Sequence, residues 1–288
     1  MKKILVLSGK GGTGKTTISS HFIEIGKSRV YADCDVEAPN LHLVNLSIDP
    51  SYKENYYGLG KYLIDQNLCV SCGECQKNCR FNAIAYVDNH YVINPFLCEG
   101  CKVCEIVCPN NAISHYKSVD GELNLYLDDL VFSTATLKMG SGNSGLLVTK
   151  VKKQLKEYIQ EDDLVIIDGP PGIGCPVIAA MSAVDLVLLV AEPSLSGYSD
   201  LERIILTAKK FHQRIAICIN KADINLALTK QIKDLSKLYD CAFVGKISYH
   251  EDIVKAVNQG KNTLPSSKAY QEIKAIFDRT ITVLKSIN

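Results

Sequence analysis

The chain has 288 residues, of which 47% are hydrophobic and 22% charged, with a formal net charge of +1. This length fits one large core, or one core with a small added module. A charge so close to zero gives no strong field for nucleic acid or an anionic membrane, so we expect neither as a partner. No apolar run reaches the length of a spanning helix, so we also expect no stable membrane insertion.

The first predicted elements are a short apolar strand over 3–7 and a helix over 16–26. Between them, Gly9 to Thr16 satisfies the P-loop pattern G-x-x-x-x-G-K-[ST]. Glycines let backbone N–H groups turn toward phosphate oxygens, Lys15 reaches the outer phosphates, and the Thr16 hydroxyl binds Mg²⁺. We therefore expect a nucleotide site formed by Gly11, Gly12, Thr13, Gly14, Lys15, Thr16 and Thr17.

A second predicted strand, over 29–33, ends in the acidic sequence Asp33-Cys34-Asp35, and Ala38-Pro39-Asn40-Leu41 follows it. In open α/β sheets, ligands bind outside the carboxyl ends of the strands. These carboxylates are therefore candidates for the nucleotide site. The alternative is that they only cap a helix.

Two cysteine runs come next. Cys69-x2-Cys72-x2-Cys75-x3-Cys79 recurs as Cys98-x2-Cys101-x2-Cys104-x3-Cys108-Pro109. This is the bacterial ferredoxin signature, in which the fourth cysteine of each run binds the other cluster. The expected ligand sets for two [4Fe–4S] clusters are Cys69, Cys72, Cys75 and Cys108 for one, and Cys98, Cys101, Cys104 and Cys79 for the other.

The residues around the two runs repeat as well, because Asn-Ala-Ile follows each fourth cysteine at the same offset. Such a repeat predicts a pseudo-symmetric module. It resembles the two-cluster bacterial ferredoxins, except that Arg80 stands where the pattern has proline. Structural zinc and disulfides are the alternatives, but zinc sites usually show pairs of ligands. Twelve cysteines instead indicate a reducing, cytoplasmic location.

Further strands are expected over 164–168, 185–191, 215–219 and 243–247, and further helices over 146–159, 176–183, 199–211, 227–238 and 267–285. The first of these strands ends at Asp168, a carboxylate placed to hold Mg²⁺. Cys175 follows closely, and either packs or binds a metal at an interface. The Gly140–Gly145 loop is either a contact with nucleotide or partner or a plain turn. The last helix is amphipathic and is expected to pack on the core.

Lys10, a second lysine early in the P-loop, resembles the deviant Walker A motif of the MinD/ParA/Mrp ATPases. The resemblance implies that Lys10 reaches the nucleotide of a partner subunit and that Asp35 positions or activates the attacking water. It also implies that Asp33 assists Asp168 and Thr16 at Mg²⁺, and that Asn220 contacts the base. Asn220-Lys221-Ala222-Asp223 also resembles the guanine signature of GTPases, but the remaining motifs favour ATP.

Alternating strands and helices predict a doubly wound, mostly parallel α/β sheet of the P-loop NTPase class. We expect an ATPase domain over 1–64 and 118–288, with a small α+β ferredoxin-like module inserted over 65–117. The expected function is an ATPase whose nucleotide-driven dimer, homodimeric or paralogous, couples to electron transfer or metallocluster maturation of a client protein. The alternative is a spatial-organiser ATPase with structural or redox-sensing clusters.

Overall fold

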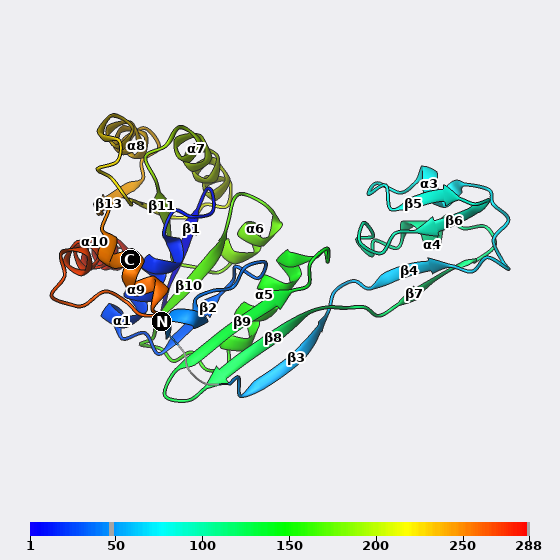
Figure 1. Cartoon of the computed structure of the whole chain (residues 1–288), viewed down its shortest axis with the longest axis horizontal. Helices are drawn as coiled ribbons and strands as arrows, with labels where there is room; N and C mark the ends of the chain where they lie inside the picture. The colour runs from blue at the N-terminus through cyan, green and yellow to red at the C-terminus, as the bar shows by residue number, and fades with distance from the viewer. Residues whose placement is uncertain (46–48, 287–288) are drawn as a thin grey trace.

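A nine-stranded sheet forms the centre of the computed structural model, which describes residues 1–45 and 49–286 (Figure 1). The strand order is β13-β12-β11-β1-β10-β2-β9-β8-β3. The first seven strands in this order are parallel, and β8 and β3 extend the sheet in the antiparallel sense. The strands are β1 (Lys2–Ser8), β2 (Val30–Asp33), β3 (Tyr52–Tyr57), β8 (Val119–Leu127), β9 (Val131–Leu137), β10 (Leu164–Pro171), β11 (Leu186–Ala191), β12 (Ile215–Ile219) and β13 (Ala242–Lys246).

All six strands expected from the sequence are present, and the mostly parallel sheet is confirmed. The central strands are continuous apolar runs that are buried on both faces, as parallel strands usually are. The sequence reading missed β3, β8 and β9. These strands mix polar and apolar residues, and β3 at the sheet edge buries only Tyr56, so they lack the apolar run that marked the others.

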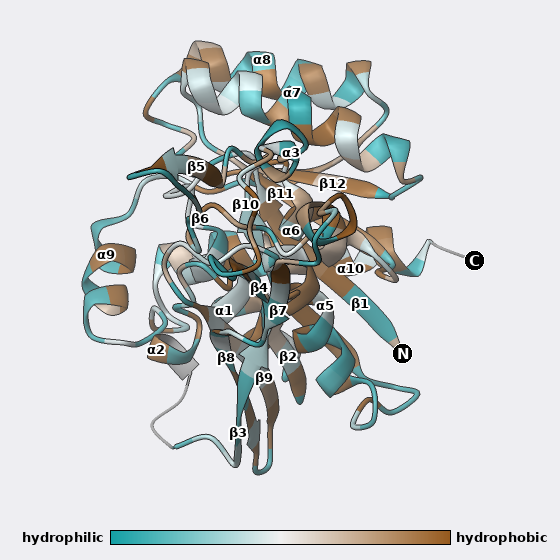
Figure 2. Ribbon diagram, turned by 90° about the vertical axis from the view of Figure 1, so that its right-hand side faces the viewer, coloured by the Kyte–Doolittle hydropathy of each residue, from teal (hydrophilic) through white to brown (hydrophobic). Residues whose placement is uncertain are grey.

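Helices cover both faces of the sheet. One core contains side chains of α5 (Ser144–Leu155), α6 (Cys175–Met181), α7 (Leu195–Lys210) and α8 (Leu226–Leu238). The other contains those of α1 (Lys15–Gly26) and α10 (Lys268–Lys285). Figure 2 shows apolar central strands between helices that carry both polar and apolar residues. Two short helices, α2 (His42–Asn45) and α9 (Glu251–Asn258), complete this part of the fold.

The last helix, α10, packs on the core as expected. Its apolar side chains, including Ile273, Ile276 and Leu284, are buried against the sheet. The Phe277 ring meets the Phe22 ring of α1 edge-on, with centroids 5.0 Å apart. Among residues 1–45 and 49–286, no helix is both long and apolar enough to cross a membrane.

The cysteine-rich segment forms a small module that projects from one side of the main body at the end of a two-stranded ribbon (Figure 1). The ribbon pairs β4 (Lys61–Ile64) with β7 (Ile113–Tyr116), so it begins before the expected boundary at residue 65. Between the two strands lie α3 (Glu74–Lys77), the hairpin of β5 (Ile84–Val87) and β6 (His90–Ile93), and α4 (Val103–Ile106). The module has its own core, centred on Tyr62, Ile84 and Ile113.

The two halves of the module share backbone details that follow the repeat. Asn82 and Asn111 both adopt positive φ, at 51° and 50°. Asparagine tolerates this left-handed region better than most residues. Each half also begins with a turn in which a side-chain oxygen accepts a backbone N–H, Asp65 Oδ1 from Asn67 and Asn94 Oδ1 from Phe96. The repeat seen in the sequence is therefore also a repeat of local structure.

Candidate functional site

The P-loop residues line a pocket of about 360 Å³ at the carboxyl ends of β1 and β10. All seven expected residues, Gly11 to Thr17, contribute to its wall. Gly14 has φ of +88°, and a β-carbon there would lie 2.3 Å from Asn220 Nδ2, so only glycine fits. Within the described part of the chain, Thr13 Oγ1 is buried without a hydrogen-bond partner, as a hydroxyl meant for a ligand would be.

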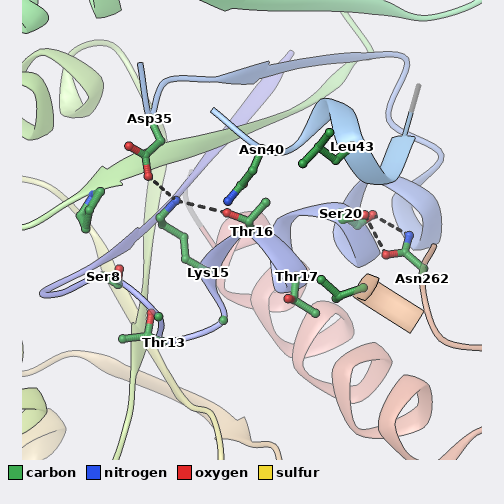
Figure 3. A pocket seen from close by; sticks show the side chains of 15 residues that line it. Ser8, Thr13, Lys15, Thr16, Thr17, Ser20, Asp35, Asn40, Leu43 and Asn262 are labelled. Atoms are coloured by element: carbon green, nitrogen blue, oxygen red, sulfur yellow. Dashed lines mark hydrogen bonds and ion pairs between the residues drawn. The ribbon is translucent and has the colours of Figure 1, made fainter. Parts of the chain in front are cut away.

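Lys15 sits among the carboxylates that the sequence singled out, and Figure 3 shows its contact with one of them, Asp35. Its Nζ lies 3.1 Å from Asp168 Oδ2 and 3.5 Å from Asp35 Oδ2. Burial would lower the pKa of Lys15, but the surrounding carboxylates, Asp168 first, raise it above its ordinary value. Lys15 is therefore a permanent cation, and it balances a cluster of negative charge in this pocket.

Asp168 lies in the buried part of β10 and connects this strand to α1. Its Oδ2 accepts a hydrogen bond of 2.7 Å from the Thr16 hydroxyl, and its Oδ1 accepts one of 2.8 Å from Ser19. The predicted neighbourhood of Thr16 and Asp168 is therefore present. Sequence reasoning missed Ser19, although its position one helical turn after Lys15 places it on the same face of α1.

Asp33 has a different set of contacts from those expected. Its Oδ1 accepts the Asp35 N–H, and its Oδ2 accepts the N–H groups of Asn40 and Leu41. Burial, followed by the charge of Asp168, raises the pKa of Asp33 to about 7. Asp33 thus shapes the segment 33–41, and a role at Mg²⁺ stays a prediction. Asp35 points into the pocket, and burial raises its pKa as well.

Lys10 is held within its own chain. Its Nζ lies 3.0 Å from Glu192 Oε1 and 3.0 Å from Ser194 Oγ, just beyond the end of β11. The other Glu192 oxygen accepts a 3.1 Å bond from Lys221. Burial opposes ionisation of Glu192, but its bonds to Lys10 and Lys221 outweigh it and lower its pKa. Glu192 was not singled out from the sequence, although its place after a parallel strand was a usable signal.

Asn220 supports the P-loop instead of lining the pocket. Its Nδ2 donates to the Thr13 carbonyl at 2.8 Å, and its Oδ1 accepts the Lys221 N–H. The far wall of the pocket consists of side chains that the sequence reading did not select, Ser20, Leu43, Val257 and Asn262. Ser20 Oγ donates to Asn262 Oδ1 at 2.7 Å (Figure 3). No motif marks these residues, which come from three separate parts of the chain. Contact between Asn220 and a base remains a prediction.

The eight cysteines of the two runs surround two small hollows in the module. Cys69, Cys72, Cys75 and Cys108 line the first hollow. Cys79, Cys98, Cys101 and Cys104 line the second hollow. Each hollow thus combines three cysteines of one run with the fourth of the other, the crossed arrangement of two-cluster ferredoxins. All eight are free thiols, so the disulfide alternative has no support.

The arrangement differs from a closed zinc site. Among the described residues, no three His, Cys, Asp or Glu side chains are close enough to hold a single metal ion. Structural zinc requires four donors at about 2.0–2.3 Å from one centre. Cys175 is exposed at the start of α6 and belongs to neither hollow.

A model of the CobQ/CobB/MinD/ParA nucleotide-binding domain matches residues 4–264. The chain belongs to this family. With its intact P-loop, it is a P-loop ATPase. It is 37% identical over 226 residues to the uncharacterized protein MJ0578 of Methanocaldococcus jannaschii, covering 77% of this chain and 79% of that protein. It is 30% identical over 293 residues to the uncharacterized protein MJ0579 of the same organism, covering 92% of each.

The fold resembles that of the septum site-determining protein MinD of Pyrococcus horikoshii, solved in complex with Mg-ADP. The TM-score is 0.59 at 18% identity, and the match covers 98% of this chain and 96% of that one. At this identity the likeness concerns the fold alone. The family assignment therefore rests on the domain match and the P-loop.

Proposed function

We propose that this ATPase is a nucleotide-switched iron–sulfur protein that passes electrons to a client protein or helps to mature a client's metallocluster. One observation carries the proposal. The same chain combines an ATPase pocket with eight free cysteines that line two hollows in crossed sets of four. Two [4Fe–4S] clusters would supply one-electron chemistry at low potential.

At the nucleotide site, the proposal assigns ATP and Mg²⁺ to the pocket beside Lys15. Backbone N–H groups of residues 11–16 bind the phosphates, and Lys15 moves from its carboxylate partners to the outer phosphates. The Thr16 hydroxyl and Asp168 would hold Mg²⁺, and the 2.7 Å hydrogen bond between them supports this assignment. Asp35 orients the attacking water. Lys10 leaves Glu192 and stabilises the developing charge in the site of a partner, a second copy or a paralogue.

Nucleotide and clusters are coupled in this proposal because the module is inserted between segment 33–41 and β10. Segments of this kind reorganise when the γ-phosphate and Mg²⁺ bind. Cluster potentials respond to solvent exposure and to hydrogen bonds at the sulfurs. One such bond is in place, from the Ala112 N–H to Cys108 Sγ at 3.3 Å.

An anaerobic redox titration with no nucleotide, ADP or a non-hydrolysable ATP analogue tests this coupling. A typical coupling free energy of about 1–3 kcal/mol corresponds to a shift of roughly 40–130 mV for one electron. By linkage, reduction must change nucleotide affinity by the same free energy. Equal potentials in all three states, with unchanged affinity, would contradict the coupling.

That negative result would favour a second function, a spatial-organiser ATPase with structural clusters. The likeness to MinD in fold supports this alternative. The two functions are distinguished by the same titration, because an organiser has no need for a potential that follows the nucleotide.

A further inference from the structure

The two cysteine runs have unequal surroundings despite their repeated sequence. In the second run, Cys98 is only 8% exposed and Gly100 is buried. At the equivalent positions of the first run, Cys69 is half-buried and Ser71 is exposed. Later in the runs the difference reverses, because Cys75 is 8% exposed and its equivalent, Cys104, is half-buried. The extra burial at the start of the second run is therefore local, and contacts made only there account for it.

The base of the ribbon provides part of this extra burial. Lys61 Nζ, itself buried, donates to the Cys98 carbonyl at 2.6 Å. A β-carbon on Gly100 would lie 2.6 Å from the Gly60 carbonyl oxygen, so the two backbones are in direct contact. These contacts fix the second run relative to the strand that leads back to the main sheet.

The loop that precedes α5 contacts two residues close to Cys98. We call residues 138–143 the bridge loop; it extends from the main body toward the module (Figure 1). A β-carbon on Gly142 would lie 2.1 Å from Glu99 Oε2, and one on Gly140 would lie 2.8 Å from the Phe96 ring. Both contacts are made by residues within two positions of Cys98. The bridge loop thus touches the second run directly.

Hydrogen bonds at both ends of the bridge loop attach it to the main body. One of them reaches segment 33–41 beside the nucleotide pocket. The Leu137 N–H, immediately before the loop, donates to the Val36 carbonyl at 2.8 Å, and Val36 follows Asp35. The Tyr56 hydroxyl donates to the Asn143 carbonyl at the end of the loop. Just inside α5, Gly145 lies against the Cys175 carbonyl, where a β-carbon would approach to 3.2 Å.

Asp120 connects this attachment to the segment that precedes ribbon strand β4. Its carbonyl accepts the Lys138 N–H at 2.8 Å, and its Oδ2 accepts the Gly58 N–H at 3.1 Å. The Asp120 side chain is buried, so these bonds form in a protected setting where they hold backbone firmly. A continuous set of bonded and packed groups therefore runs from Val36 to Glu99.

We infer that the bridge loop transmits the nucleotide state to the second hollow (Cys79, Cys98, Cys101 and Cys104) in preference to the first. The inference rests on the proposed function, and it assigns different roles to the two clusters. The second cluster responds to nucleotide. The first cluster exchanges electrons with the partner without responding directly. Phe96 and Glu99 are the positioning residues of this link.

Hydrogen–deuterium exchange on the anaerobic iron-loaded protein tests the inference, with and without a non-hydrolysable ATP analogue and Mg²⁺. Residues 33–41 should change their exchange rates and serve as the internal control. Residues 94–101 should change with them by at least about threefold, a readable difference in local opening. Residues 65–72, the equivalent segment of the first run, should not change.

The repeat provides a matched pair of double variants. Phe96→Ala with Glu99→Ala removes the side chains that touch the bridge loop. Asn67→Ala with Val70→Ala changes the equivalent positions of the first run. In the wild type, reduction should alter affinity for the analogue at least about fivefold, equivalent to about 40 mV at 59 mV per tenfold. The first double variant should lower this factor below about twofold, and the second should preserve it.

Failure of the link differs from failure of the proposed function. If residues 33–41 respond but residues 94–101 do not, or if both runs respond equally, the bridge loop is not the link. Retention of the full affinity change by the Phe96 and Glu99 double variant would overturn it too. Absence of iron, or no response in residues 33–41, would instead reject the nucleotide-switched iron–sulfur protein itself.

Discussion

Lys10 and Lys15 belong to the same loop but have different partners. Lys15 is buried, with Asp168 3.1 Å and Asp35 3.5 Å from its Nζ. Lys10 is partly exposed and is held by Glu192 and Ser194 at the rim. We propose that the cation inside the pocket binds phosphate in its own chain. We propose that the cation at the rim acts across an interface once Glu192 releases it.

Replacing these two lysines should therefore have different effects. Lys15→Ala should abolish nucleotide binding, because the phosphates lose their direct cation. Lys10→Ala should leave the dissociation constant for ATP within about twofold but lower hydrolysis by about 10³, the smaller effect typical of a transition-state cation. Equilibrium binding of a fluorescent ATP analogue measures the dissociation constant, and phosphate-release kinetics measure the rate of hydrolysis. Hydrolysis by Lys10→Ala at the wild-type rate would remove the deviant Walker assignment.

Asp35 provides a second prediction at this scale. Asp35→Ala should bind ATP but hydrolyse it at least about 10²-fold more slowly, because the attacking water loses its positioning carboxylate. The ATP-bound protein should then accumulate as a dimer in light scattering. Glu37→Ala, an exposed acid two residues away, is the matched control and should retain wild-type turnover. A monomeric, ATP-loaded Asp35→Ala protein would contradict the proposed dimer switch.

The sequence predicted which residues belong to the nucleotide pocket, but it predicted few of the hydrogen bonds that these residues make. The P-loop residues and Asp168 could be predicted because a motif and a strand end specify where they lie. The three backbone bonds of Asp33 and the link from Asn220 to Thr13 could not, since they depend on how separate loops pack. Ser20 and Asn262 meet only in the folded chain, from positions 242 residues apart.

At the scale of elements, α1 is tied to the C-terminal region through a buried histidine. The His21 ring lies with Nε2 2.9 Å from Thr263 Oγ1 and Nδ1 2.7 Å from the Thr17 carbonyl. Burial lowers the pKa of His21 below its ordinary value of 6.5. The folded state therefore resists protonation where the unfolded state accepts it, so this contribution to stability is lost as pH falls below 6.5.

Thermal unfolding at several pH values tests this. The wild-type free energy of unfolding should fall between pH 7.5 and 5.5, by about 1.4 kcal/mol for each unit by which the pKa is lowered. His21→Gln removes the titrating ring and should show a shallower pH dependence, even if its stability at pH 7.5 is lower. His212→Gln, at an exposed position, should retain the wild-type slope. Equal slopes in all three proteins would refute the assignment.

Strands and helices could be predicted from the sequence where a single apolar pattern dominated. Apolar runs identified the central parallel strands, and apolar periodicity identified α10. The strands β3, β8 and β9 were not predicted, because their stability comes from pairing across the sheet, which local sequence does not display. The ribbon of β4 and β7 was not predicted for the same reason, since its two strands are separated in sequence by the whole module.

At the scale of the whole molecule, the chain combines two architectures with different requirements. The ATPase sheet buries its core on both faces, whereas the module has a small core in which Cys75 and Cys98 are themselves buried members. A core this small usually needs disulfides or metal for stability. All its cysteines are free, so the clusters that we propose would also stabilise the module.

The central claim is that the two hollows hold two [4Fe–4S] clusters, and anaerobic analysis of iron, acid-labile sulfide and zinc tests it most directly. The wild type should contain about eight iron and about eight sulfide per chain, with broad visible absorbance. Cys75→Ser should lose about half through the first hollow and Cys104→Ser about half through the second, while Cys241→Ser, outside both hollows, should lose none. A protein that binds only zinc, with no broad visible absorbance, would contradict the account.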